Sequence, residues 1–211
     1  MSGGTDAGSQ RPLIAVLDYG IGNLRSAHKA LEHVGADARL TADRGLVADA
    51  DGVVLPGVGA FGACMAALDA TGLDTVAIEA ARSGRPFLGI CVGLQLLCSE
   101  SEESPDIEGL GIFDVGVARI TGDVKLPQMQ WNRLEVTRPN PTFNGLDPQP
   151  WMYFVHSYAA CDSPMTVATC DYGGPVVAAM SEGSVTAVQF HPEKSSSAGL
   201  RLLANFVDSC S

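Results

Sequence analysis

The chain has 211 residues and is acidic, with 24 Asp and Glu against 13 Lys and Arg and a formal net charge of −11 at pH 7. This charge repels phosphate backbones and anionic lipid, which argues against nucleic acid and membranes as partners. The N-terminus lacks the basic and apolar blocks of a secretory signal, and the six scattered cysteines form no C-x-x-C pair. We therefore expect a cytoplasmic protein without a metal site or cofactor, with a flexible tail over residues 1–11.

The first half of the chain alternates apolar strands with helices. Residues 13–18 are a continuous apolar run of strand length, and residues 23–34 carry apolar residues at helical spacing before a glycine stop. The other predicted elements of this half are strands at residues 38–41, 52–55 and 86–90 and a helix at residues 73–82. This alternation predicts an α/β fold with a mostly parallel twisted sheet, helices on both faces, and functional loops at the carboxyl ends of the strands.

Beyond residue 109, short β-rich runs replace the alternation. They lie at residues 113–120, 131–137, 152–158, 166–171, 176–180 and 185–190, and a helix over residues 197–208 closes the chain. The acidic stretch 100–108 is interpreted as a solvated loop. We expect antiparallel strands to extend one edge of the sheet. No repeat or linker divides the chain, so residues 12–211 are predicted to form a single domain.

One predicted strand runs directly into Cys91, which is bracketed by Gly89 and Gly93 and followed at once by a helix. This is the pattern of a nucleophile elbow with sulfur in place of oxygen, in which the glycines let strand and helix approach closely. The first N–H groups of the helix favour the thiolate over the thiol. The alternative, a small buried apolar cysteine, needs no glycine on both sides. We expect Cys91 to be presented rather than buried, as a nucleophile.

A cysteine nucleophile needs a base, and His191 follows a predicted strand at the same kind of strand end as Cys91. Pro192 biases His191 toward an extended backbone, so that the carboxylate of Glu193 can orient the imidazole. We therefore predict a catalytic triad of Cys91, His191 and Glu193. The remaining histidines have no such orienting carboxylate and are interpreted as structural residues: His28, His33 and His156.

A glycine-rich loop at residues 56–59 follows the predicted strand at residues 52–55. Its N–H groups, that of Val58 in particular, could form an oxyanion hole with the N–H of Val92. Residues 57–62 also match the G-x-G-x-x-G pattern of dinucleotide-binding proteins. However, the next strand ends in Cys91, where a nicotinamide-binding unit would carry the acid that binds the ribose hydroxyl, and this disfavours the alternative.

The elbow at residues 89–93 and the string His191-Pro192-Glu193 resemble those of the class I (triad) glutamine amidotransferases. Within that class the chain is similar to the glutaminase subunits of imidazole glycerol phosphate synthase, through five strings at residues 18–23, 56–61, 129–132, 153–158 and 191–195. The resemblance implies a flavodoxin-like fold and hydrolysis of L-glutamine to glutamate and ammonia. It also implies a heterodimer in which ammonia passes to a (β/α)₈ cyclase subunit, in a step of histidine biosynthesis.

The same resemblance implies roles for two further sets of residues. Those that match glutamine-binding positions are Gly59, Gln95, Glu103, Ser157 and Tyr158. Those that match positions facing the cyclase are Asn23, Trp131, Asn132, Tyr153 and Lys194. Without the family, Trp131 and Tyr153 would be interpreted as core residues and Lys194 as a solvated charge. Gln130 replaces a glycine that is common in the family's interface string.

Two alternatives remain open on the sequence alone. One is the glutaminase subunit of another triad amidotransferase, such as those that feed pyridoxal phosphate or anthranilate synthesis. The other is a non-enzymatic thiol sensor on the same elbow, for which Cys91 alone would suffice. For the glutaminase, we also predict that the peptide between Gly57 and Val58 is a switch that aims or withdraws an oxyanion donor, so that the partner gates hydrolysis.

Overall fold

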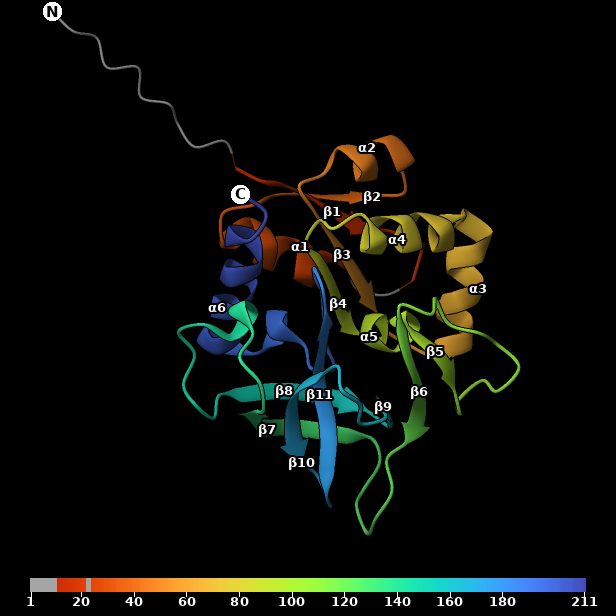
Figure 1. Cartoon of the computed structure of the whole chain (residues 1–211), viewed down its shortest axis with the longest axis vertical. Coiled ribbons are helices and arrows are strands. Elements are labelled where there is room, and N and C mark those ends of the chain that lie inside the picture. Colours follow the sequence, from red (N-terminus) through yellow and green to blue (C-terminus); the bar gives the residue numbers. More distant parts are fainter. Residues whose placement is uncertain (1–10, 22–23) are drawn as a thin grey trace, which may run out of the picture.

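The computed structural model describes residues 11–21 and 24–211. Figure 1 shows strands at the centre with helices packed on both sides of them. The predicted tail, except for Arg11, lies outside the described residues, and so does Asn23. The interpretation of residues 12–211 as one domain stays a prediction.

The described residues contain a larger and a smaller sheet. The strands of the larger sheet are β1 (Leu13–Leu17), β2 (Asp37–Thr41), β3 (Gly52–Gly57), β4 (Phe87–Cys91), β7 (Gln128–Val136), β8 (Trp151–His156), β10 (Thr166–Asp171), β11 (Pro175–Glu182) and β12 (Val185–Val188). Those of the smaller sheet are β5 (Cys98–Ser101), β6 (Phe113–Arg119) and β9 (Tyr158–Ala160). The larger sheet has the order β2-β1-β3-β4-β12-β11-β10-β7-β8. Its pairings are parallel from β2 to β12 and antiparallel beyond, which confirms the predicted fold class.

Two groups of helices cover the parallel half of the sheet. The helices are α1 (Leu24–His33), α2 (Arg44–Asp49), α3 (Phe61–Thr71), α4 (Leu73–Arg82), α5 (Val92–Leu97) and α6 (Ser196–Asp208), with 3₁₀ turns η1 (Pro141–Phe143) and η2 (Pro192–Lys194). Helix α1 packs with α6, and α3 packs with α4 and α5, on opposite sides of the strands (Figure 1). Among the described helices none alone could span a membrane by length and hydropathy; α3 and α4, bent by 94°, meet those criteria only as a pair.

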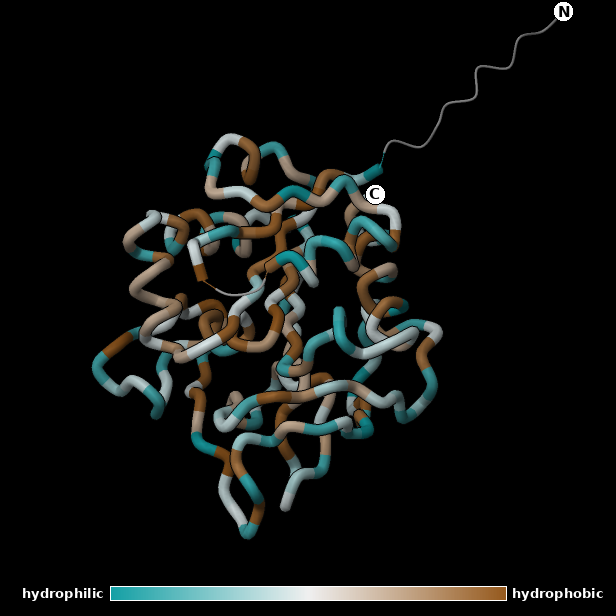
Figure 2. Tube along the Cα trace, turned by 180° about the vertical axis from the view of Figure 1, so that it is seen from behind, coloured by the Kyte–Doolittle hydropathy of each residue, from teal (hydrophilic) through white to brown (hydrophobic). Residues whose placement is uncertain are grey.

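The positions of apolar residues explain these layers. Strands β3, β4 and β12 are buried at every position, as expected for parallel strands covered on both faces. Hydrophobic residues recur along the central strands in Figure 2. Helix α1 buries Leu24, Ala27, Ala30 and Leu31, a helical spacing that gives it one apolar face.

Several elements differ from the sequence prediction. The strand expected over residues 152–158 is divided at Ser157, where the chain passes from β8 in the larger sheet to β9 in the smaller one. Helix α2 was not predicted, although Asp43 caps it by accepting a hydrogen bond from the N–H of Leu46 at 2.8 Å. The stretch 100–108 is not wholly a solvated loop, because its first two residues belong to β5 and pair with β6.

Candidate functional site

The turn at Cys91 is as sharp as an elbow requires. Cys91 ends β4 directly before α5, with φ 57° and ψ −111°, a backbone conformation that is strained for a residue other than glycine. A Cβ atom at Gly93 would lie 1.9 Å from the carbonyl oxygen of Leu55, and one at Gly89 would lie 2.9 Å from Cδ1 of Leu97. Both glycines therefore permit α5 to lie directly against β3 and β4.

Cys91 is more enclosed than the sequence analysis predicts. Only 3% of the residue is exposed, so the prediction that it is presented rather than buried is wrong. The sulfur is nonetheless not packed in hydrocarbon alone, because Cys91 lines a cavity of about 500 Å³ together with His191. The walls of that cavity come from segments far away in the sequence, among them Glu103 and Tyr158, and they cover the elbow.

His191 reaches this cavity from the segment between β12 and η2. Its Nδ1 lies 2.8 Å from Oε1 of Glu193, and its ring lies within hydrogen-bonding reach of Cys91. The side chains of His191 and Glu193 are only 3% and 6% exposed. Burial lowers the pKa of His191, but the contacts with Cys91 and Glu193 outweigh burial and raise the pKa to about 9. The three residues predicted as a triad therefore lie together, with the ring between the thiol and the carboxylate.

Backbone hydrogen bonds hold His191 in this place. Its N–H donates to the carbonyl oxygen of Tyr153 in β8 at 2.9 Å. The hydroxyl of Ser195 donates to the carbonyl oxygen of His191 at 2.6 Å and accepts from the N–H of Tyr153 at 3.0 Å. The segment that carries His191 and Glu193 is thus fixed to β8 on both sides of η2.

The residues predicted to bind glutamine all line the same cavity. They are Gly59, Gln95, Glu103, Ser157 and Tyr158, and the expected oxyanion residues Val58 and Val92 lie among them. Gln95 Nε2 donates to the carbonyl oxygen of Tyr158 at 2.9 Å and to Oε1 of Gln189 at 3.1 Å, which leaves the side-chain oxygen of Gln95 for a ligand. Glu103 Oε2 accepts from the first N–H of α3 at 2.7 Å. Glu103 and Lys194 give the cavity a carboxylate and an ammonium, which complement the two charged groups of an α-amino acid.

The sequence analysis missed two residues of this site. Gln189 is fully buried, and its Nε2 lies 3.8 Å from the sulfur of Cys91. The sequence feature that could have identified Gln189 is its position as a lone amide in an apolar strand, two positions before His191. His156 was interpreted as a structural residue, yet it lines the cavity. Its Nδ1 lies 2.8 Å from the carbonyl oxygen of Tyr158, and its buried Nε2 has no partner in the described protein. Burial lowers the pKa of His156 to about 4, so the ring is neutral at pH 7.

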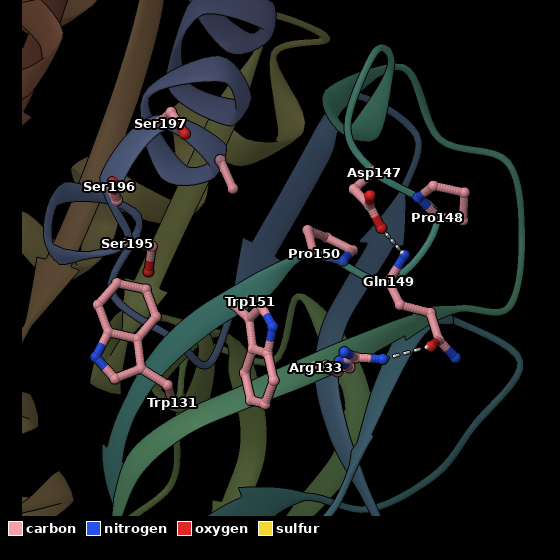
Figure 3. A pocket seen from close by; sticks show the side chains of 11 residues that line it. Trp131, Arg133, Asp147, Pro148, Gln149, Pro150, Trp151, Ser195, Ser196 and Ser197 are labelled. Atoms are coloured by element: carbon pink, nitrogen blue, oxygen red, sulfur yellow. Dashed lines mark hydrogen bonds between the residues drawn. The ribbon is translucent and has the colours of Figure 1, made fainter.

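A second hollow, of about 630 Å³, lies between the β7–β8 hairpin and the start of α6 (Figure 3). Trp131 and Trp151 line it and are 43% and 51% exposed, and the guanidinium of Arg133 lies 5.1 Å from the ring centroid of Trp151. Trp131 packs edge to face on Tyr153 at a centroid distance of 6.0 Å. We call Trp131, Arg133, Trp151 and Tyr153 the aromatic face. Because Trp131 is exposed, the interpretation of Trp131 as a core residue is wrong.

The other residues predicted to face a partner are placed differently. Lys194 is exposed and lines the catalytic cavity. Asn132 donates to the carbonyl oxygen of Asp171 at 2.7 Å and accepts from Gln130, so its polar atoms are engaged within the chain. The six cysteines, all within the described ranges, are free thiols. Those ranges also contain no group of three or more His, Cys, Asp or Glu side chains able to hold a metal ion.

Comparisons with known proteins give the family of the chain. The model of a family described as "Glutamine amidotransferase class-I" matches residues 15–210. A Syntrophotalea carbinolica protein named "Imidazole glycerol phosphate synthase subunit HisH" is 49% identical over 93% of this chain and 100% of its own length. A Halobacterium salinarum protein of the same name is 48% identical over 98% of this chain and 97% of its own.

Solved structures show the same fold at lower sequence identity. A Thermotoga maritima structure described as PurLQS has a TM-score of 0.75 and 20% identity, covering 94% of this chain and 99% of its own. A structure described as a glutamine amidotransferase has a TM-score of 0.74 and 20% identity, with coverages of 93% and 98%.

Proposed function

The chain belongs to the class-I glutamine amidotransferase family, and from this premise we propose that it is the glutaminase subunit of imidazole glycerol phosphate synthase. Membership confirms the resemblance drawn from the sequence motifs. The enzyme hydrolyses L-glutamine to glutamate and ammonia, and the ammonia passes to a (β/α)₈ cyclase subunit in histidine biosynthesis. The observation that carries the reaction is the 2.8 Å contact between His191 and Glu193, with Cys91 in reach of the ring inside one cavity.

The chemistry follows from the order of these three groups. The thiolate of Cys91 attacks the side-chain amide carbon, and the N–H groups of Val58 and Val92 stabilise the oxyanion. The imidazolium of His191 donates its proton to the amide nitrogen, so that ammonia leaves and a thioester remains. The neutral ring then takes a proton from water, whose oxygen attacks the thioester and releases glutamate and the thiolate. Glu193 stays ionised and orients the ring throughout.

The charges of the cavity select the substrate. We expect the carboxylate of Glu103 to bind the α-ammonium of glutamine and Lys194 to bind its α-carboxylate. Gln95, Ser157 and Tyr158 complete the wall that holds the side chain in line with Cys91. No step needs a metal or a cofactor.

The aromatic face is the expected docking site for the cyclase. Exposed tryptophans with an adjacent arginine are the residue types enriched at the centre of protein interfaces. Tyr153 belongs to this face, and its backbone binds the catalytic segment at His191 and Ser195. Docking therefore occurs beside the catalytic residues, where ammonia is produced. Free thiols at all six cysteines support the proposed cytoplasmic location.

Glutamate release, measured with and without the cyclase subunit and its nucleotide substrate, tests the reaction and the partner together. We expect weak release from the isolated chain, strong release from the complex, and none from Cys91→Ala in either state. The matched control is Cys161→Ala, which removes an exposed thiol outside the catalytic cavity and keeps full activity. Glutamate production by Cys91→Ala would remove Cys91 from the mechanism, whereas His191→Ala that retains the full function of the protein would favour the thiol-sensor alternative. Activation by another synthase in place of the cyclase would favour the other amidotransferases.

A further inference from the structure

The loop at residues 56–59 carries the proposed oxyanion donor Val58. Two buried side chains outside the triad donate hydrogen bonds to carbonyl oxygens of this loop. The hydroxyl of Tyr19 donates to the carbonyl oxygen of Pro56 at 2.7 Å. The thiol of Cys64 in α3 donates to the carbonyl oxygen of Val58 at 3.5 Å. Tyr19 is 2% exposed and Cys64 is fully buried. Neither residue lines the catalytic cavity, so neither acts on the substrate directly.

These two hydrogen bonds fall on either side of one peptide group. The carbonyls of Pro56 and Val58 are held, whereas among the described residues no side chain hydrogen-bonds to the peptide between Gly57 and Val58. Gly57 itself is pressed against the elbow, since a Cβ atom there would lie 2.8 Å from the nitrogen of Gly93. The loop is therefore fixed at three points around the single peptide that presents the N–H of Val58.

The hydroxyl of Tyr19 and the thiol of Cys64 both stay protonated at neutral pH and can therefore act as hydrogen-bond donors. Burial, followed by the neighbouring Cys64 and Cys91, raises the pKa of Tyr19. Burial also raises the pKa of Cys64. Each side chain thus keeps its one proton at neutral pH and holds its carbonyl acceptor.

We propose that Tyr19 and Cys64 are positioning residues that brace the oxyanion loop, confining its reorientation to the Gly57–Val58 peptide. This inference rests on the proposed glutaminase function and deepens it. Without the brace, the peptides on both sides of the Gly57–Val58 peptide also reorient, and the N–H of Val58 spends less time aimed at the oxyanion. Because the oxyanion exists only in the reaction, the brace acts on kcat and leaves glutamine binding unchanged.

The test is Tyr19→Phe, which removes only the hydroxyl, assayed in the complex with the cyclase subunit and its nucleotide substrate. Complete loss of an oxyanion donor costs about 10²- to 10³-fold in kcat, so a misdirected donor is expected to cost less, about tenfold, with KM for glutamine unchanged. The matched control is Tyr172→Phe, because the Tyr172 hydroxyl also donates to a backbone carbonyl, that of Lys125, but lies outside the catalytic cavity. We expect the control to keep the wild-type kcat.

Cys64 gives a second, independent arm. Cys64→Ala is expected to lower kcat, and Cys64→Ser to restore it by supplying a new donor in the same place. Wild-type kcat in Tyr19→Phe and Cys64→Ala overturns the brace, and so does a loss that appears in KM instead. If Tyr19→Phe does not fold, the Cys64 variants are sufficient by themselves. The brace is then overturned if the kcat is the same in the wild type, Cys64→Ala and Cys64→Ser. A wild-type complex without glutaminase activity overturns the proposed function itself, which distinguishes the two failures.

Discussion

Replacing Gly93 with alanine tests the geometry on which the elbow depends. The new Cβ would lie 1.9 Å from the carbonyl oxygen of Leu55 and 3.0 Å from its carbonyl carbon. A carbon and a carbonyl oxygen approach to about 3.3 Å at closest, so α5 and β3 must separate by about 1.4 Å. Both atoms belong to backbone, and no side-chain rotation relieves the contact. The helix must move as a unit, and it carries the N–H of Val92 with it.

Two opposing effects decide the magnitude. Gly93 lies within α5 and has no positive φ, so helix propensity alone favours alanine by about 1 kcal/mol. Overpacking a tight contact costs about 1–3 kcal/mol and occasionally more, and a backbone clash of this size belongs at the upper end. We expect Gly93→Ala to lower the free energy of unfolding by about 2 kcal/mol. A displacement near 1 Å at a reacting group costs about 10²-fold, so kcat should fall by that factor.

Urea unfolding and steady-state glutamate release measure both effects. Gly116→Ala is the matched control, because its Cβ would meet Glu100 Cγ at 3.4 Å, an ordinary contact with a flexible side chain. We expect that control to stay within about 0.5 kcal/mol of the wild type and to keep its kcat. If Gly93→Ala matched Gly116→Ala in both measurements, the close approach of α5 to β3 would not be a requirement of the site.

Two further predictions concern pH. Glu193→Gln removes one of the contacts that raise the pKa of His191 to about 9. The alkaline limb of the pH profile of kcat/KM should therefore move to lower pH. If the limb did not move, the raised pKa would be due to the contact with Cys91 alone. The stability that His191 gains is present below its ordinary pKa of 6.5 and is lost as pH rises through about 9. His156 affects stability in the opposite direction, because its pKa in the folded protein is lowered to about 4. The stability that its neutral ring contributes is present above pH 6.5 and is lost as the pH falls through about 4. Urea unfolding across this acid range should give a shallower pH dependence for His156→Gln than for the wild type, and equal slopes would contradict the burial argument.

The sequence predicted those parts of the site that depend on neighbours along the chain. Gly89 and Gly93 identify the elbow because a strand and a helix that meet so closely require both. The enclosure of Cys91 could not be predicted in this way, because the wall is built by Glu103 and Tyr158, which reach it only through the smaller sheet. The break at Ser157 has the same origin, since only the tertiary structure divides the predicted strand over residues 152–158 between two sheets.

The meeting of Cys91 and His191 depends on where β12 enters the sheet, and no local pattern gives that. An apolar run reports burial but not which strand lies beside it. Strand β12 pairs in parallel with β4, with Val188 opposite Ile90, so both chains leave the sheet at the same edge. Beyond the end of β12, Gln189 and His191 both lie beside Cys91, whereas Phe190 between them packs on Phe154 at a centroid distance of 5.6 Å. A slip of one residue would turn Phe190 toward the cysteine and the imidazole away from it. The aromatic contact between Phe190 and Phe154 therefore helps to fix the register that the triad requires.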